Sequence, residues 1–121
     1  MLQDEELSYT IRGCVFEVYR TLGAGFLESV YQEALLYELG AAGVKAVAEV
    51  PLSVSYKGQD VGFFRADIVV EDRVILELKA QKTLPPYAEA QLLNYLKASR
   101  LKLGMLVNFT EPKASVKRLV L

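Results

Sequence analysis

The sequence is organised around one stretch, residues 65–79, which reads RADIVVEDRVILELK. Two largely apolar runs flank a polar segment at residues 71–73, and this pattern predicts a β-hairpin. Side chains alternate between the two faces of a strand, so Glu77 and Lys79 share a face. If the polar segment forms a three-residue loop, Asp67 lies directly opposite Glu77, with their Cβ atoms ~5 Å apart.

The hydrophobic pattern favours this register, in which Val70 pairs with Val74. One face then carries Arg65, Asp67, Val69, Ile75, Glu77 and Lys79. The other face is entirely apolar and carries Ala66, Ile68, Val70, Val74, Leu76 and Leu78. A two-residue loop would pair Asp67 with Leu76 and mix charged side chains into the apolar set, which burial disfavours.

Two interpretations of the paired acids remain open on the residues alone. One is a solvated strand face on which the acids pair with basic neighbours, as is common on half-exposed strands. The other is a metal site, because two carboxylates this close repel each other unless one is protonated or a cation lies between them. A hard divalent cation would bind Asp67, Glu77 and the backbone carbonyl of Leu78. Lys79 would then orient an attacking water or neutralise charge on a phosphate.

Periodic apolar residues on either side of the hairpin predict the remaining elements. We expect helices at residues 7–22, 26–39 and 83–99 and strands at 50–56, 61–70, 73–79, 103–109 and 116–121. Pro51 cannot donate a ladder hydrogen bond, so the first strand is expected at a sheet edge. The third helix is expected to open at residues 83–86, because proline fits the first turn of a helix. The order α-α-β-β-β-α-β-β predicts an α/β fold with a mixed central sheet flanked by helices.

The composition is that of a globular protein. The chain has 121 residues, of which 52% are hydrophobic and 24% charged, and we expect residues 1–121 to form one domain. No apolar run reaches the roughly 18 residues of a membrane span, so no membrane association is expected. Cys14 is the single cysteine of the sequence, which favours a reducing, cytoplasmic setting.

The sequence contains no histidine. This excludes Ser-His-Asp and Cys-His nucleophile pairs, histidine-based zinc sites and an imidazole general base. Catalysis would therefore depend on carboxylates, lysines, tyrosines or a metal. Oxygen ligands favour Mg²⁺ or Mn²⁺ over zinc.

The charge is unevenly distributed along the chain, although the net charge is only -1. Residues 1–76 contain 6 Lys and Arg against 12 Asp and Glu, whereas residues 77–121 contain 8 against 3. Such a polarised chain can present a basic face to a phosphate backbone. On the counts alone, lysines that simply solvate exposed faces remain the simpler interpretation.

Four motifs in series resemble one known family. They are GFLESVY at residues 25–31, FRAD at 64–67, LELKA at 76–80 and EAQLLNYL at 89–96. The first is a complete G-x-x-E-x-x-Y motif, and together the four resemble the GxxExxY family of the PD-(D/E)XK nuclease superfamily. The resemblance extends over nearly the whole chain and implies a restriction-endonuclease-like core.

The resemblance also implies roles for particular residues. Asp67 and Glu77 would be metal ligands and Lys79 the catalytic lysine. Glu28 would reach the metal directly or through water, and Gln91 would be the polar helix residue that completes the site. The implied cofactor is Mg²⁺ or Mn²⁺, and the implied reaction is attack of metal-activated water on a phosphodiester of DNA or RNA.

Some of these positions have alternative roles. With Gly25 as N-cap, Glu28 would occupy the third helical position, where a capping-box carboxylate bonds the N-cap amide. Tyr31 lies one turn from Glu28 and could bond within the site or simply belong to the core. Relatives commonly have histidines where this chain has Tyr19 and Tyr87, and tyrosine is a poor base at neutral pH.

Two functions follow from the sequence. The first is a Mg²⁺- or Mn²⁺-dependent nuclease. The alternative is a catalytically idle nuclease-fold module that binds nucleic acid or a protein partner, and in that case Gln91 would only meet solvent. The small size of the chain favours a homodimer or a protein partner for substrate capture.

Overall fold

The computed structural model describes residues 4–121, and its elements follow the predicted order. Within this range there are three helices and five strands. They are α1 (Asp4–Leu22), α2 (Glu28–Ala41), β1 (Ala46–Tyr56), β2 (Gln59–Val70), β3 (Val74–Lys79), α3 (Ala88–Ser99), β4 (Leu103–Asn108) and β5 (Ser115–Val120). None of the three helices combines the length and the hydropathy that a bilayer span requires.

The five strands form a mixed sheet in the order β1-β2-β3-β4-β5. Strands β3 and β4 are parallel, and every other neighbouring pair is antiparallel. Helix α3 lies in the crossover connection that a parallel pair requires. Strand β1, which contains Pro51, lies at one edge, as predicted, and strand β5 lies at the other.

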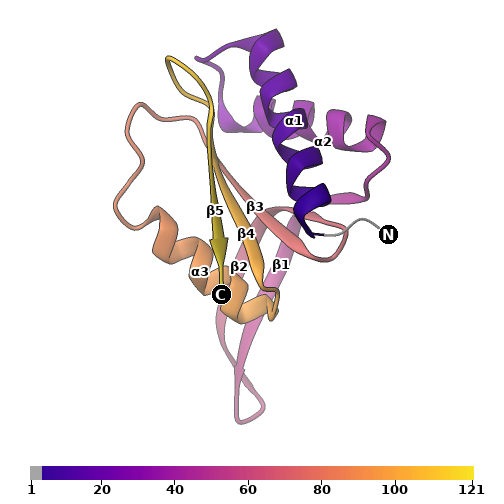
Figure 1. The fold of residues 1–121 in the computed structure, drawn as a ribbon. Coiled ribbons are helices and arrows are strands. Elements are labelled where there is room, and N and C mark those ends of the chain that lie inside the picture. Colours follow the sequence, from indigo (N-terminus) through magenta and orange to yellow (C-terminus); the bar gives the residue numbers. More distant parts are fainter. Residues whose placement is uncertain (1–3) are drawn as a thin grey trace.

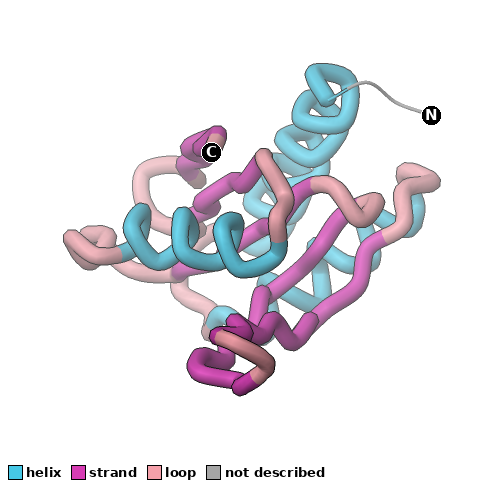
Figure 2. The backbone as a smooth tube through the Cα atoms, turned by 90° about the horizontal axis from the view of Figure 1, so that it is seen from below, coloured by secondary structure: helices cyan, strands magenta, loops and turns pink. Residues whose placement is uncertain are grey.

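Helices cover both faces of the sheet. Figures 1 and 2 show α1 and α2 on one side and α3 on the other. On the first side, Ile68, Val70 and Leu76 pack with residues of α1 and α2. On the second side, Val69 and Ile75 pack with residues of α3. This arrangement confirms the predicted α/β class and is consistent with a restriction-endonuclease-like core.

The β2–β3 hairpin has the predicted register. Val70 pairs with Val74 and Ile68 with Leu76, around the loop of residues 71–73. The regular pairing ends at Ile68 and Leu76, and Asp67 and Glu77 are the next residues of the two strands.

The predicted division of the hairpin into two faces is wrong at one residue. Ala66 packs on the α3 side with Val69, although strict alternation would place it with Ile68. The strand therefore changes face at Asp67. The residue of β1 that corresponds to Asp67 is Glu49, whose φ of 55° is a left-handed conformation that side chains rarely adopt. We attribute the change of face to this local twist.

Two predicted helix starts are also wrong. Residues 83–86 do not open α3, which begins at Ala88 with Tyr87 as its N-cap. Two prolines in succession explain the delay, because the residue before a proline is disfavoured in the helical region. Helix α2 begins at Glu28 rather than Phe26, and its N-cap is Leu27.

Candidate active site

Asp67 and Glu77 are joined crosswise through the backbone of the β2–β3 hairpin. The amide of Asp67 donates to Oε1 of Glu77 at 3.1 Å, and the amide of Leu78 donates to Oδ2 of Asp67 at 2.8 Å. The regular pairing of the two strands ends one step earlier, at Ile68 and Leu76. The two carboxylates thus take over from backbone carbonyls as acceptors where the strands diverge.

Glu77 is buried and Asp67 is half-buried, which disfavours the charged form of the pair. Glu77 is only 4% exposed, and burial, followed by the charge of Asp67, raises the pKa of Glu77 to about 8. Burial also raises the pKa of Asp67, against the hydrogen bond from Leu78. Two adjacent acids with raised pKa values hold a proton at neutral pH unless a cation compensates their charge. The pair therefore has the electrostatics of a cation site.

Lys79 follows in the same strand as Glu77, two residues on. Its positive charge lowers the pKa of both acids, which opposes the effect of burial. Lys79 forms no ion pair within residues 4–121. Its amine therefore remains available to a water or a phosphate beside the pair.

Glu28 is the first residue of α2 and has an exposed side chain. Its charge raises the pKa of both Asp67 and Glu77, so it acts electrostatically on the pair. The proposed capping box is wrong, because the N-cap is Leu27 and no side chain caps the helix. No group of three acids or cysteines in the described part of the chain is placed to hold a metal ion. A direct role for Glu28 in the site therefore stays a prediction.

Tyr31 belongs to the core and supports the loop that precedes Glu28. It is fully buried, and its ring stacks on that of Phe109 with centroids 4.3 Å apart. The hydroxyl donates to the carbonyl of Gly23 at 2.6 Å and accepts from the amide of Phe26 at 3.2 Å. These bonds fix the loop from which α2 starts.

Helix α3 brings Tyr95 near the acid pair. Tyr95 is 8% exposed, and burial raises its pKa, with further contributions from the charges of Glu77 and Asp67. Gln91 lies one turn earlier on the helix and is half-buried, and its role in the site stays a prediction. Sequence reasoning missed Tyr95, although its spacing of four residues from Gln91 placed both on one helix face.

Glu49 is a second residue that sequence reasoning missed. It corresponds to Asp67 on the neighbouring strand, and its charge raises the pKa of Asp67. Nothing in the sequence around it indicates a left-handed conformation.

The two tyrosines that the sequence resemblance set against histidines have different surroundings in the structure. Tyr19 is half-buried and packs against the core under α1 and α2. Tyr87 is 62% exposed at the start of α3. Neither supplies the acid-base chemistry of a histidine at neutral pH.

Comparison with known proteins adds an independent finding. A family model described as the PD-(D/E)XK nuclease superfamily matches residues 5–119. The chain belongs to this superfamily. Membership supports a nuclease-like function, and PD-(D/E)XK nucleases generally use divalent metals.

A solved structure shares the fold of this PD-(D/E)XK domain. The crystal structure of SSO0001 has a TM-score of 0.54 and 14% sequence identity, covering 94% of this chain and 76% of that one. At this identity the likeness concerns the fold alone. A comparison with curated proteins finds no match.

Proposed function

We propose that this chain is a divalent-metal-dependent nuclease that hydrolyses phosphodiester bonds in DNA or RNA, and that it belongs to the GxxExxY family of the superfamily. The observation that carries the proposal is the pair of the half-buried Asp67 and the buried Glu77 beside Lys79. A like-charged pair withdrawn from water is unfavourable by itself and is usually found where a ligand or a reaction uses it.

The donor set fits Mg²⁺ or Mn²⁺. Both ions prefer oxygen ligands, and the raised pKa values of the two acids mark a place where a cation would relieve their repulsion. Asp67, Glu77 and the carbonyl of Leu78 would hold the ion, and Glu28 would bind it directly or through water. When bound, such an ion lowers the pKa of an attacking water and neutralises charge on the phosphate.

The chain's own groups supply the remaining functions. The amides of Asp67 and Leu78 orient the two carboxylates before any ligand binds, which reduces the reorganisation that binding requires. The ammonium of Lys79 orients the attacking water or stabilises negative charge that develops on the phosphate. Gln91 offers an amide to the water or the phosphate from α3.

A second function is favoured by one observation. Within residues 4–121 no three acids converge, and Glu28 is exposed. An idle nuclease-fold module would retain the acid pair without a complete metal site, and would bind nucleic acid or a protein partner, or act as a homodimer. The nuclease is the better-supported function because Lys79 is kept beside both acids, where an idle site would not need it.

The proposal extends to how and where the chain works. Residues 1–121 would act as a single domain. The buried thiol of Cys14 suits a reducing, cytoplasmic setting.

A cleavage assay tests the nuclease. The purified chain is incubated with single-stranded DNA, double-stranded DNA, branched DNA and RNA, each with Mg²⁺, with Mn²⁺ or with EDTA. We expect cleavage of at least one substrate that requires the metal and is lost in Lys79→Ala. Lys102→Ala is the matched control, since Lys102 carries the same charge but lies directly before β4, at the opposite end of the β3–β4 pair from Lys79. If no substrate is cut under any metal condition, the idle module replaces the nuclease.

A further inference from the structure

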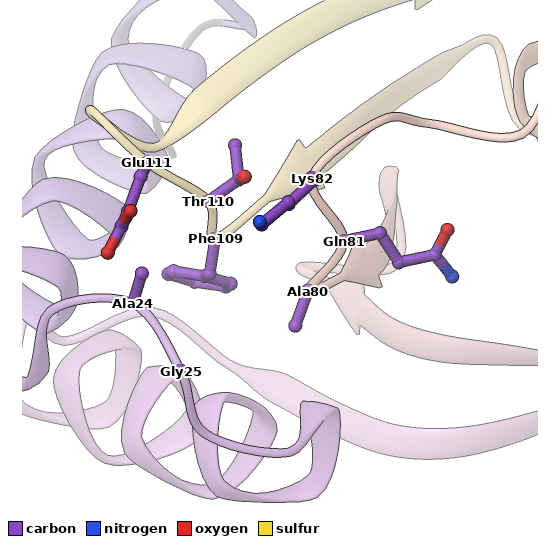
Figure 3. A pocket seen from close by; sticks show the side chains of 8 residues that line it. All are labelled: Ala24, Gly25, Ala80, Gln81, Lys82, Phe109, Thr110 and Glu111. Atoms are coloured by element: carbon purple, nitrogen blue, oxygen red, sulfur yellow. The ribbon is translucent and has the colours of Figure 1, made fainter.

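A cavity of about 190 Å³ lies beside the candidate site, at the carboxyl ends of the parallel strands β3 and β4 (Figure 3). One wall is formed by residues 80–82, which directly follow Lys79. The opposite wall is formed by Ala24 and Gly25, in the loop that leads to Glu28. The segments that line the cavity therefore adjoin two candidate site residues in the sequence, Lys79 and Glu28.

The first wall is fixed by a buried asparagine. Asn108 is 3% exposed and pairs with Lys79 across the parallel strands. Its Oδ1 accepts from the amide of Gln81 at 3.0 Å, and its Nδ2 donates to the carbonyl of Gln81 at 2.8 Å. The amide of Phe109 also donates to the carbonyl of Lys79 at 2.9 Å. The chain after Lys79 is thereby held in one conformation although it has left the sheet.

The second wall is fixed by the Tyr31 hydroxyl, through its two hydrogen bonds to the loop of residues 23–26. Phe109 lies between the two walls, its ring stacked on Tyr31 at an interplanar angle of 3°. Both walls, and the Phe109 ring between them, are thus fixed by hydrogen bonds and ring stacking. A cavity built in this way needs little reordering to accept a ligand, which favours binding.

The polar groups of the cavity identify the chemistry of its ligand. Lys82 contributes an amine, Thr110 a hydroxyl and Glu111 a carboxylate. In Figure 3 the amine of Lys82 extends towards Phe109, whereas the side chain of Gln81 points away. None of these three polar side chains has a hydrogen bond or an ion pair within the described chain that would occupy it.

The charges of Lys82 and Glu111 balance, so the cavity does not favour a phosphate, which would meet the carboxylate. A ligand that both donates and accepts hydrogen bonds and has apolar faces fits better, because Ala24 and Ala80 provide apolar surface beside the ring of Phe109, which is itself only 1% exposed. A nucleobase has these properties. The ribose or deoxyribose has hydroxyls but lacks the flat apolar faces.

We propose that this cavity receives one unpaired nucleobase of the nucleic-acid substrate, from a nucleotide next to the phosphate held at Asp67 and Glu77. This inference rests on the proposed function and adds the part of the substrate that is recognised. The distances are compatible: Lys82 lies three positions after Lys79 in the chain, so their Cα atoms are at most roughly 11 Å apart. A neighbouring nucleotide lies within such a span of the cut phosphate, since each nucleotide of a strand advances only ~3.4 Å along a duplex.

A binding experiment tests the inference separately from cleavage. All proteins carry Lys79→Ala, which prevents cutting, and Mg²⁺ is present throughout. The probes are a fluorescein-labelled single-stranded oligodeoxynucleotide and an abasic strand of equal length and charge. We expect the strand with bases to bind about tenfold more tightly, as for a few hydrogen bonds that involve charged groups.

Two variants connect this preference to the cavity. Lys82→Ala removes the amine, and Ala24→Leu fills the space, so each should weaken binding of the strand with bases and leave the abasic strand unchanged. Lys102→Ala removes a lysine directly before β4, at the end of the strand away from the cavity. It should affect the binding of both oligonucleotides alike. Thermal unfolding checks each variant, and the exposed Lys82 keeps the test decisive if Ala24→Leu does not fold.

The outcomes separate the inference from the proposed function. The inference would be overturned if the two strands bound equally, or if Lys82→Ala weakened the binding of both strands by the same factor. This holds even if the wild-type chain cuts nucleic acid. The chain could instead prefer the strand with bases, lose this preference in Lys82→Ala, and cut no substrate. That result would support nucleobase binding in the cavity and contradict the proposed nuclease activity. If neither strand binds, the inference is wrong, and the cleavage assay on all four substrates alone decides the nuclease.

Discussion

The backbone amide of Leu78 donates a 2.8 Å hydrogen bond to Oδ2 of Asp67. Leu78 lies between Glu77 and Lys79, so this bond ties Asp67 to the strand that carries the other two groups of the candidate site. The bond stabilises the charged form of Asp67, whereas burial disfavours it. The hairpin is thus held together, where its ladder stops, by the side chains that would have to accept a cation.

The stability of the metal-free protein should fall as the pH rises from about 5 to about 8. The pKa of Glu77 is about 8 in the folded protein, against a usual value near 4.5. In this window the folded state binds more protons than the unfolded state, so the free energy of unfolding decreases with pH, by an amount on the order of a few kcal/mol. Urea unfolding in EDTA at several pH values measures the change.

Glu77→Gln serves as the control for this pH dependence. The glutamine stays neutral at every pH, so its free energy of unfolding should change much less between pH 5 and pH 8 than that of the wild type. The pH dependence would contradict the raised pKa if both proteins lost stability equally.

Mg²⁺ should raise the melting temperature at pH 8, because an ion that binds only the folded state stabilises it by mass action. A concentration one hundred times the Kd corresponds to about 2.7 kcal/mol. Glu77→Ala should lose the shift, while Lys79→Ala should keep it and lose cleavage. Thermal melts with Mg²⁺, compared with melts in NaCl of equal ionic strength, provide the measurement. A shift that persists in Glu77→Ala would mean that the ion binds elsewhere.

Glu28→Gln should weaken Mg²⁺ binding by roughly tenfold, the effect expected of a group that acts through a water or at the edge of the metal site. The free energy of unfolding should change by less than ~1 kcal/mol, because Glu28 is exposed and caps no helix amide. Calorimetric titration gives the affinity. Glu33→Gln, which removes another exposed acid of α2, is the matched control. If both substitutions lowered the Mg²⁺ affinity equally, Glu28 would act only as a surface charge and not as part of the site.

Asn108→Ala should lower the free energy of unfolding by roughly 2–4 kcal/mol. The substitution removes two hydrogen bonds and leaves both the amide and the carbonyl of Gln81 without their partner. Urea unfolding measures the loss. Asn94→Ala is the control, since Asn94 is exposed on α3 and its replacement should change stability by less than about 0.5 kcal/mol.

Two glycine substitutions should have opposite effects on stability. A Cβ on Gly104 would lie 3.0 Å from Cγ and Cδ1 of Leu92, where β4 meets α3, so Gly104→Ala should destabilise the protein by about 1–3 kcal/mol. Gly13 is exposed within α1 and has no atom within 4 Å of an added Cβ. Gly13→Ala should therefore stabilise the protein by about 0.5–1 kcal/mol. Equal effects would contradict the packing of α3 on β4.

The position of the acid pair could be predicted because burial constrains the hairpin. Ile68, Val70 and Leu76 must face the core together, and only one register allows this. That register also brings Asp67 opposite Glu77. The two acids could therefore be located from a hydrophobic pattern, because the alternation that places apolar residues on one face of a strand also places the other residues on the opposite face.

Other parts of the site lacked a signal of this kind. The left-handed conformation of Glu49, to which we attribute the position of Ala66 on the α3 side, has no signal in the neighbouring sequence. The fixing of Gln81 by Asn108 joins residues 27 positions apart, which no local pattern reports. The late start of α3, in contrast, could have been predicted, because the restriction that Pro86 imposes on Pro85 is visible in the sequence.

The parallel pairing of β3 with β4 determines the order in which the site is completed during folding. The β2–β3 hairpin closes over a short loop, but Val74 and Leu103 lie 29 positions apart and meet only when the segment between them has closed. Contacts between distant residues form slowly because the entropy of loop closure opposes them. We therefore expect the two carboxylates to meet early and Asn108 and Tyr95 to arrive late. A chain that has folded only this far would already hold its acids together and would still lack the walls around them.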